Sequence, residues 1–190
     1  LSFLRWFLRW AAKKGYYPGN LHDTFKPKMK GVDGNKEIIY LTRDEIARLE
    51  SWQFAPTQSS LARVRDVFLF CCFTGLRYSD VAKLKRTDIK DGFFDVVTQK
   101  THEGLRIELN DHAKAILDKY KDDDIKDDLA LPVISNVKTN ARLKILGQVC
   151  GIDEPVRIVY FQGNERIEQV MPKWALLTTH CGRRTFVVTA

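Results

Sequence analysis

The chain has 190 residues, of which 44% are hydrophobic and 29% charged, a balance that excludes an intrinsically disordered protein. This length allows one ordinary domain plus part of a second. Its formal net charge is +7, which favours a polyanionic partner, although a solvated basic surface is the alternative. No apolar stretch approaches the ~20 residues that span a bilayer, so no membrane partner is expected.

The basic charge lies outside one acidic segment. Residues 121–128 carry a local charge of −3, which leaves +10 for the remainder. Residues 1–30 alone carry +6 and form the most basic part of the chain. The lysines in this part that we expect to contact a polyanion are Lys13, Lys14, Lys26, Lys28 and Lys30.

The four cysteines indicate a reduced, intracellular protein. Cys71 and Cys72 are adjacent in an apolar run, where a free thiol behaves as a small hydrophobic group. No C-x-x-C spacing occurs, so the sequence predicts neither a zinc site nor a redox motif.

The first residues predict an amphipathic helix. Phe3, Trp6, Phe7 and Trp10 recur at helical spacing, and Gly15 ends the pattern. So wide an aromatic face on a short helix favours the end of a preceding helical domain; packing on the main domain is the alternative. We therefore divide the chain into residues 1–30, an end of that domain plus a basic linker, and residues 31–190, the main domain.

Helix signals dominate the first part of the main domain. Thr42 and Glu45 form a capping box for a helix that runs to about Trp52. A second helix, capped by Ser59 or Ser60, is apolar over 64–73 and ends at Gly75. A third begins near Ser79.

Two hairpins alternate with further helices in the second part. The strands are expected at 93–98 and 105–109, and again at 157–161 and 166–170. Asp111 caps a helix to Tyr120, Ser135 caps one to Gly151, and Thr178 or Thr179 caps the last. The predicted class is α+β, mostly helical with small β-hairpins.

Arg77 follows the helix break in Thr74-Gly75-Leu76-Arg77. A loop held between two helix ends can aim a guanidinium, whose planar fork suits two phosphate oxygens. Asp80 could hold Arg77 in place, or could simply favour the first turn of the next helix. By itself an arginine in a loop more often forms a structural ion pair.

Lys100 lies near the tip of the first predicted hairpin. A lysine on such an arm can protonate a leaving oxygen if desolvation and neighbouring arginines lower its pKa. The alternative is one exposed lysine among many.

His180 and Arg183 lie three residues apart and so share one face of the last helix. An arginine near a helix N-terminus is opposed by the dipole, and a bound anion would explain its position. A structural role is the alternative for this pair alone. The order of Arg77, Lys100 and His180-x-x-Arg183, each at an element boundary, indicates convergence on one phosphate.

Two segments carry a resemblance to a known family. Residues 74–81, Thr-Gly-Leu-Arg-Tyr-Ser-Asp-Val, and 179–186, Thr-His-Cys-Gly-Arg-Arg-Thr-Phe, resemble the signature boxes of the tyrosine recombinase, or phage integrase, family. Gln99-Lys100-Thr101 lies where that family keeps its hairpin lysine. The resemblance covers roughly residues 36–190 and is similar in character to integrases of mobile elements such as transposons.

This resemblance implies an integrase-like catalytic domain that cleaves and rejoins DNA through a 3′-phosphotyrosyl intermediate. Arg77 and Arg183 would bind the scissile phosphate, and Lys100 would protonate the departing 5′-hydroxyl. His180 would assist proton transfer and bind the phosphate, while Asp80 would support Arg77. The family needs no metal ion or other cofactor, because arginines neutralise the phosphate.

The family's nucleophilic tyrosine follows the second box, and we expect it beyond Ala190. Residues 1–190 alone are therefore predicted to be inactive, with no nucleophile or metal ligand among them. The implied partners are double-stranded DNA at a specific site and other protomers, in a tetramer on DNA. The implied location is the nucleoid in a bacterial cytoplasm.

Two other functions compete with this one. A catalytically inactive DNA-binding or regulatory module would keep the fold and the anion pocket. A metal-dependent nuclease is disfavoured, because no cluster of Asp and Glu surrounds the two boxes to hold Mg²⁺.

Overall fold

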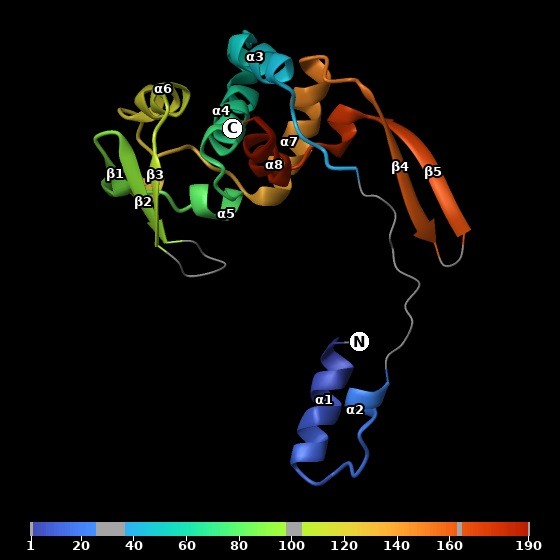
Figure 1. Cartoon of the computed structure of the whole chain (residues 1–190). Helices are drawn as coiled ribbons and strands as arrows, with labels where there is room; N and C mark the ends of the chain where they lie inside the picture. The colour runs from blue at the N-terminus through green and yellow to red at the C-terminus, as the bar shows by residue number, and fades with distance from the viewer. Residues whose placement is uncertain (1, 26–36, 98–103, 163–164, 190) are drawn as a thin grey trace.

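A computed structural model describes residues 2–25, 37–97, 104–162 and 165–189 (Figure 1). The helices are α1 (Ser2–Lys13), α2 (Leu21–Thr24), α3 (Arg43–Ser51), α4 (Ser59–Thr74), α5 (Tyr78–Val81), α6 (Asp111–Tyr120), α7 (Asn136–Val149) and α8 (Thr179–Thr189). The strands are β1 (Ile89–Lys90), β2 (Phe93–Val97), β3 (Gly104–Glu108), β4 (Pro155–Gln162) and β5 (Glu165–Pro172). Mostly helical α+β architecture is thereby confirmed. No helix in the described ranges is long and apolar enough to cross a membrane.

Helix α4 is the centre of the main domain, because it is apolar on more than one side. Val67, Phe70 and Cys71 pack into a core with β2, α6 and the segment after α5. Phe68 and Cys72 face a second core built with α3, α7 and α8. A helix that is hydrophobic all round belongs in the interior, and Figure 1 shows α4 between the two groups of elements.

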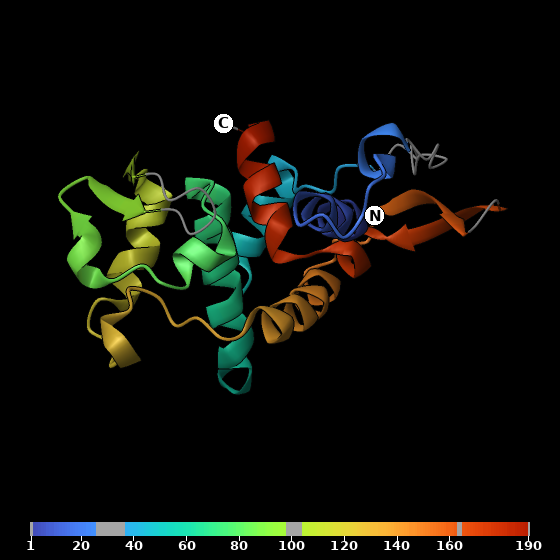
Figure 2. The ribbon, with the colours of Figure 1, turned by 90° about the horizontal axis from the view of Figure 1, so that it is seen from below.

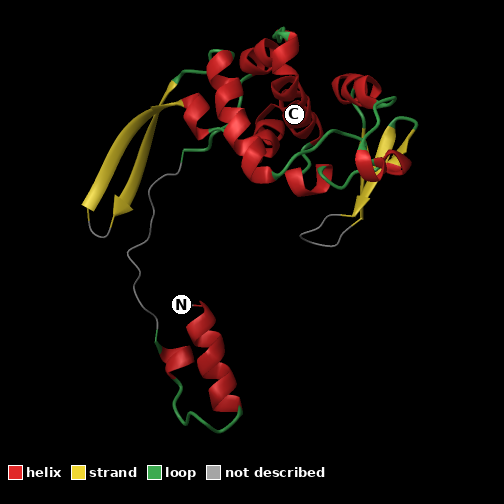
Figure 3. Ribbon diagram, turned by 180° about the vertical axis from the view of Figure 1, so that it is seen from behind, coloured by secondary structure: helices red, strands yellow, loops and turns green. Residues whose placement is uncertain are grey.

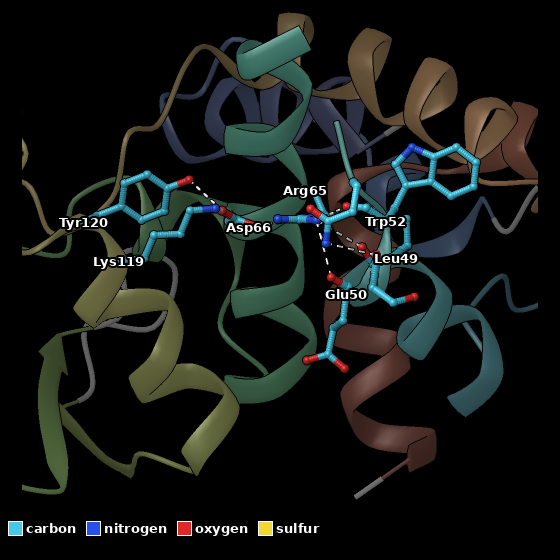
Figure 4. A network of polar contacts seen from close by, with 9 residues as sticks. Leu49, Glu50, Trp52, Arg65, Asp66, Lys119 and Tyr120 are labelled. Carbon is cyan, nitrogen blue, oxygen red and sulfur yellow. Dashed lines mark hydrogen bonds and ion pairs between the residues drawn. The ribbon is translucent and has the colours of Figure 1, made fainter. Parts of the chain in front are cut away.

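A buried polar network crosses the middle of α4 (Figure 4). The Asp66 carboxylate accepts hydrogen bonds from Arg65 Nε at 2.8 Å, Tyr120 Oη at 2.6 Å and Lys119 Nζ at 2.5 Å. Arg65 also donates to the carbonyl groups of Leu49, Glu50 and Trp52 at the end of α3. The network therefore ties α3 and α6 to opposite sides of α4, and its partners offset the cost of burying the charge.

The two sheets lie at opposite sides of the helices (Figure 3). Strands β1, β2 and β3 form an antiparallel sheet in that order, with Phe94 opposite both Ile89 and Ile107. Strands β4 and β5 form a separate antiparallel pair in register from Pro155–Pro172 to Gln162–Glu165. Figure 2 shows this pair projecting beyond the helices.

The start of α3 confirms the capping box and adds an ion pair. Thr42 Oγ1 accepts from the Glu45 backbone N–H, and Glu45 Oε2 accepts from the Thr42 N–H at 2.7 Å. Lys173 Nζ, also buried, lies 2.8 Å from the same Glu45 oxygen. Because Lys173 follows β5, this pair fixes the base of the β4–β5 hairpin to α3.

Several element boundaries differ from the sequence prediction. The cap of α6 is Asn110, not Asp111, since the Asn110 side chain accepts from the Ala113 N–H at 2.8 Å. Helix α4 is preceded by a 3-10 turn, and Gln58 rather than a serine occupies its cap position. Strand β1 was not predicted, because two residues carry too short a pattern to detect.

Helix α1 forms as predicted and packs against α2. Arg9 pairs with Asp23 at 3.0 Å, and Gly15 follows the helix with a φ of 76°. The aromatic face of α1 stays exposed, with 75% of Phe3 and 61% of Trp6 accessible. The described structure therefore gives this face no core of its own to enter.

Candidate phosphate-binding site

The end of α4 fixes the position of Arg77. Gly75 takes the left-handed conformation, with φ 67°, and its N–H donates to the Cys71 carbonyl at 3.0 Å. Arg77 is then the cap residue of α5 in extended conformation, and its carbonyl accepts from the Asp80 and Val81 N–H groups. The half-buried Arg77 side chain thus leaves the backbone at a rigid junction of two helices.

Helix α8 carries the second predicted pair. His180 is exposed in its first turn, and Arg183, half-buried, lies one turn further along. Gly182 between them is buried against α4: a Cβ at this position would meet Cys71 Cβ at 2.9 Å. The absence of a side chain at Gly182 therefore lets α8 approach α4 closely.

The two arginine-bearing segments meet in space. Arg183 Nη1 donates to the Gly75 carbonyl at 3.0 Å, across 108 residues of sequence. Phe186, on the next turn of α8, packs over Gly75, where an added Cβ would lie 2.5 Å from its ring. Residue 183 is thus bonded to the loop that carries residue 77.

Asp80 lies buried behind this loop in the first turn of α5. Ser79 Oγ donates to Asp80 Oδ1 at 3.5 Å. Burial and the negative charge of Asp80 raise the pKa of the Cys71 thiol to about 12. Its predicted support of Arg77 stays a prediction.

The remaining predicted residues are placed only in part. Lys100, the predicted proton donor, lies outside the described residues, as do Lys26, Lys28 and Lys30. Lys13 and Lys14 are exposed at the end of α1 and the turn after it. No group of three or more His, Cys, Asp or Glu side chains that could hold a metal occurs within the described ranges. Independence from metal remains a prediction.

Sequence reasoning missed four residues around the site: Tyr78, Asn136, Thr139 and Asn140. Tyr78 Oη bonds to the Ile134 carbonyl and lies 2.8 Å from Thr139 Oγ1, and burial raises its pKa. Asn140 Oδ1 accepts from the Thr179 N–H at 2.8 Å. These bonds join residues 39 to 61 positions apart, so no local pattern could have indicated them.

This arrangement suits a phosphodiester. Two arginine-bearing segments meet beside the N-terminus of α8, whose dipole favours an anion. Planar guanidinium groups can bind phosphate oxygens in pairs, and His180 is exposed about one turn before Arg183 on α8. The chemistry available is charge neutralisation and hydrogen bonding at a phosphate.

No family model and no curated protein matches the sequence. Solved structures do match the fold. A lambda integrase tetramer bound to a Holliday junction aligns with 98% of this chain and 51% of that chain, at TM-score 0.63 and 21% identity. The XerA recombinase aligns with 80% of this chain and 50% of that chain, at TM-score 0.53 and 18% identity.

A third match is to a shorter structure. The lambda integrase catalytic core aligns with 79% of this chain and 84% of that chain, at TM-score 0.50 and 19% identity. The chain has the integrase catalytic fold. The prediction of an integrase-like domain is thereby confirmed for the fold, although the chain spans only about half the length of the XerA and tetrameric lambda integrase chains.

Proposed function

We propose that this chain is the phosphate-binding part of a tyrosine recombinase, an enzyme that cuts and rejoins DNA strands at a specific site. The observation that carries the proposal is the bond from Arg183 to the Gly75 carbonyl. It joins the two signature boxes within a fold shared with solved recombinases. Neither the boxes nor the fold alone would support this function as well.

We assign a role to each candidate residue. Arg77 and Arg183 bind non-bridging oxygens of the scissile phosphate and neutralise charge that develops there. A single arginine finger in other phosphoryl-transfer enzymes contributes ~10³–10⁵ in rate. His180, exposed in the first turn of α8, moves a proton at the attacking group. Lys100 protonates the departing 5′-hydroxyl, and Asp80 holds Arg77.

The attacking tyrosine is assigned to none of residues 1–190. Tyr78 is excluded from that role by its own contacts, since its hydroxyl bonds to α7 and its pKa is raised. Tyr160 lies on the projecting β4–β5 hairpin, apart from both boxes in the chain. Residues 1–190 alone then bind DNA without forming a covalent bond to it.

The alignments with lambda integrase structures of different length support a division of this chain into two domains. The lambda integrase catalytic core covers 79% of this chain, whereas the longer tetramer chain covers 98%. This difference supports residues 1–30 as the end of a separate helical domain with its linker, and residues 31–190 as the catalytic domain.

The partners follow from the same proposal. Lambda integrase structures are described as a dimer bound to a core site and a tetramer bound to a Holliday junction. For this chain we propose double-stranded DNA at a specific site and other protomers, which places it with the bacterial nucleoid. Mobile-element DNA is the substrate that the two boxes favour.

Replacing Arg183 tests the function in the full-length gene product. Arg183→Ala is expected to lower cleavage of a nicked DNA substrate by ~10³ or more, because the phosphate loses a guanidinium. DNA affinity should change by less than about threefold, since many other basic contacts remain. Covalent protein–DNA product is measured on denaturing gels in EDTA, and affinity by fluorescence anisotropy.

Arg184→Ala is the matched control, because it removes the same charge from the neighbouring position of α8. It should cleave within about threefold of the unaltered protein. Equal losses in both variants would make Arg183 a structural residue. If the unaltered protein binds DNA but never cleaves it, the chain is an inactive DNA-binding module instead.

A further inference from the structure

The first turn of α7 contacts both arginine-bearing segments through different side chains. Asn136, Thr139 and Asn140 share one face of the helix, because residues three and four apart are neighbours on its surface. That face bonds to Tyr78, next to Arg77, and to Thr179, next to His180. A single rigid turn therefore holds two segments that are far apart in sequence.

The contact with α8 satisfies a backbone donor at the start of that helix. The Thr179 N–H, one of the first donors of α8, donates to Asn140 Oδ1 at 2.8 Å. Thr179 Oγ1 donates to Asn136 Oδ1 at 3.0 Å, and Asn140 Nδ2 lies 3.4 Å from the same oxygen. The Thr178 hydroxyl, which could have capped the helix locally, lies 3.5 Å from Cys181 Sγ instead.

The contact with α5 is buried. Thr139 is 2% exposed, and its hydroxyl lies 2.8 Å from Tyr78 Oη, which itself donates to the Ile134 carbonyl. A phenol held by two partners cannot shift without leaving a buried polar group unsatisfied, which is costly. Tyr78 therefore fixes the start of α5, and with it the cap position that Arg77 occupies.

We propose that the first turn of α7 positions the two phosphate-binding arginines relative to each other, with Asn140 setting α8 and Thr139 setting Tyr78. This inference rests on the proposed function, because it names positioning residues for the same site. The Arg183–Gly75 bond joins the same two segments directly. Loss of either α7 contact lets one arginine move while the other stays.

Small displacements of this kind have large effects on rate. Misplacing a reacting group by about 1 Å can cost ~10²-fold in rate, whereas ground-state contacts along the DNA backbone tolerate such a shift. A positioning role therefore lowers the rate at saturating DNA and spares affinity. If the role were purely structural, the cleavage rate would instead fall in proportion to the loss of stability.

Asn140→Leu in the full-length protein is the decisive variant, since it removes the oxygen that accepts from Thr179. Cleavage of the nicked substrate at saturating DNA should fall about tenfold or more, with DNA affinity within about threefold. Asn140→Asp keeps an acceptor for the Thr179 N–H and should recover most of that rate. Tyr78→Phe, which removes both bonds of the phenol, should lower the rate in the same way.

Asn110→Ala is the matched control. Asn110 caps α6 through the same kind of bond, from the Ala113 N–H at 2.8 Å, and its Nδ2 donates to the Phe73 carbonyl of α4 at 3.1 Å. None of the assigned residues lies on α6. Asn110→Ala should lower the melting temperature comparably while the rate at saturating DNA stays within about threefold. If Asn110→Ala and Asn140→Leu lower the rate equally, the positioning role is wrong.

Inorganic phosphate separates this inference from the proposed function. In the 190-residue chain, phosphate should shift the NMR signals of the Arg77 and Arg183 Nε–Hε groups. Free phosphate, unlike DNA, has no contacts outside the site, so Asn140→Leu should weaken its binding about fivefold or more. If phosphate shifts these NMR signals but the full-length protein does not cleave DNA, the proposed recombinase function is wrong and the positioning role stands. Equal phosphate affinity in Asn140→Leu and the unaltered chain, or no phosphate shifts at all, would overturn the positioning role.

Discussion

Two glycines determine how closely the two signature segments approach. Gly75 supplies a left-handed conformation that side chains rarely adopt, and the Phe186 ring occupies the space beside it. Gly182 lies within an α-helix, where alanine is ordinarily the better residue. Here Cys71 Cβ fills the position that an alanine methyl would take. Both glycines therefore serve the contact between α4 and α8.

Replacing Gly75 by alanine should destabilise the protein by more than the backbone strain alone. Gly92→Ala is the control, because Gly92 has a similar φ of 83° but no atom within 4 Å of the added Cβ. We expect Gly92→Ala to lower the free energy of unfolding by about 1 kcal/mol. Gly75→Ala should lower the free energy of unfolding by about 1–3 kcal/mol more than Gly92→Ala does, since the added methyl must displace Phe186. Urea unfolding measures both; equal losses would mean that Phe186 moves away freely.

At the scale of the element, an exposed charge cluster joins the three strands of the first sheet. Asp95 on β2 lies 2.9 Å from Lys90 Nζ on β1 and 3.0 Å from Arg106 Nε on β3. Arg106 also lies over the Phe93 ring, 4.3 Å from its centroid. Two of these strands, β2 and β3, flank the segment that contains Lys100.

The cluster predicts a pH dependence of the sheet. The hydrogen bonds from Arg106 and Lys90 lower the pKa of Asp95 from 3.8 to about 2. Because the folded pKa is depressed, the stabilisation is complete above pH 3.8 and is lost as the pH falls towards about 2. NMR titration of the Asp95 carboxyl carbon measures this value. Arg106→Gln should move the midpoint back towards 3.8; an unchanged midpoint would contradict the assigned cause.

At the scale of the whole molecule, α4 supports two cores and the site lies at its end. One core joins α4 to the first sheet and α6, and the other joins it to α3, α7 and α8. The Asp66 network ties both groups to the middle of the same helix. Arg77 follows this shared helix. A movement of the elements in either core would therefore displace Arg77.

The net charge of +7 predicts DNA binding that weakens steeply with salt. The logarithm of affinity should fall with the logarithm of salt concentration at about −0.9 per phosphate neutralised. Replacing both Lys13 and Lys14, which are exposed, by glutamine should reduce the slope by about one to two. Fluorescence anisotropy across a salt series measures it. An affinity independent of salt would contradict electrostatic binding.

Local patterns predicted most of the fold. The capping box at Thr42, the left-handed Gly75 and the Ser135 cap of α7 all form as expected, because each depends on residues within one turn. Boundaries failed where two neighbouring residues could serve as the cap, as at Asn110 and Asp111. The four site residues were missed for another reason: their bonding partners are distant in sequence.

The sequence by itself determined the residue types, their order and the helix ends that carry them, because caps, glycines and charges act over a few residues. Tertiary structure alone decided that Arg183 bonds to the Gly75 carbonyl and that Asn140 caps α8. Such contacts depend on the packing of distant helices against α4. Their distance in sequence, 39 and 108 residues, is the physical reason that no pattern along the chain could specify them.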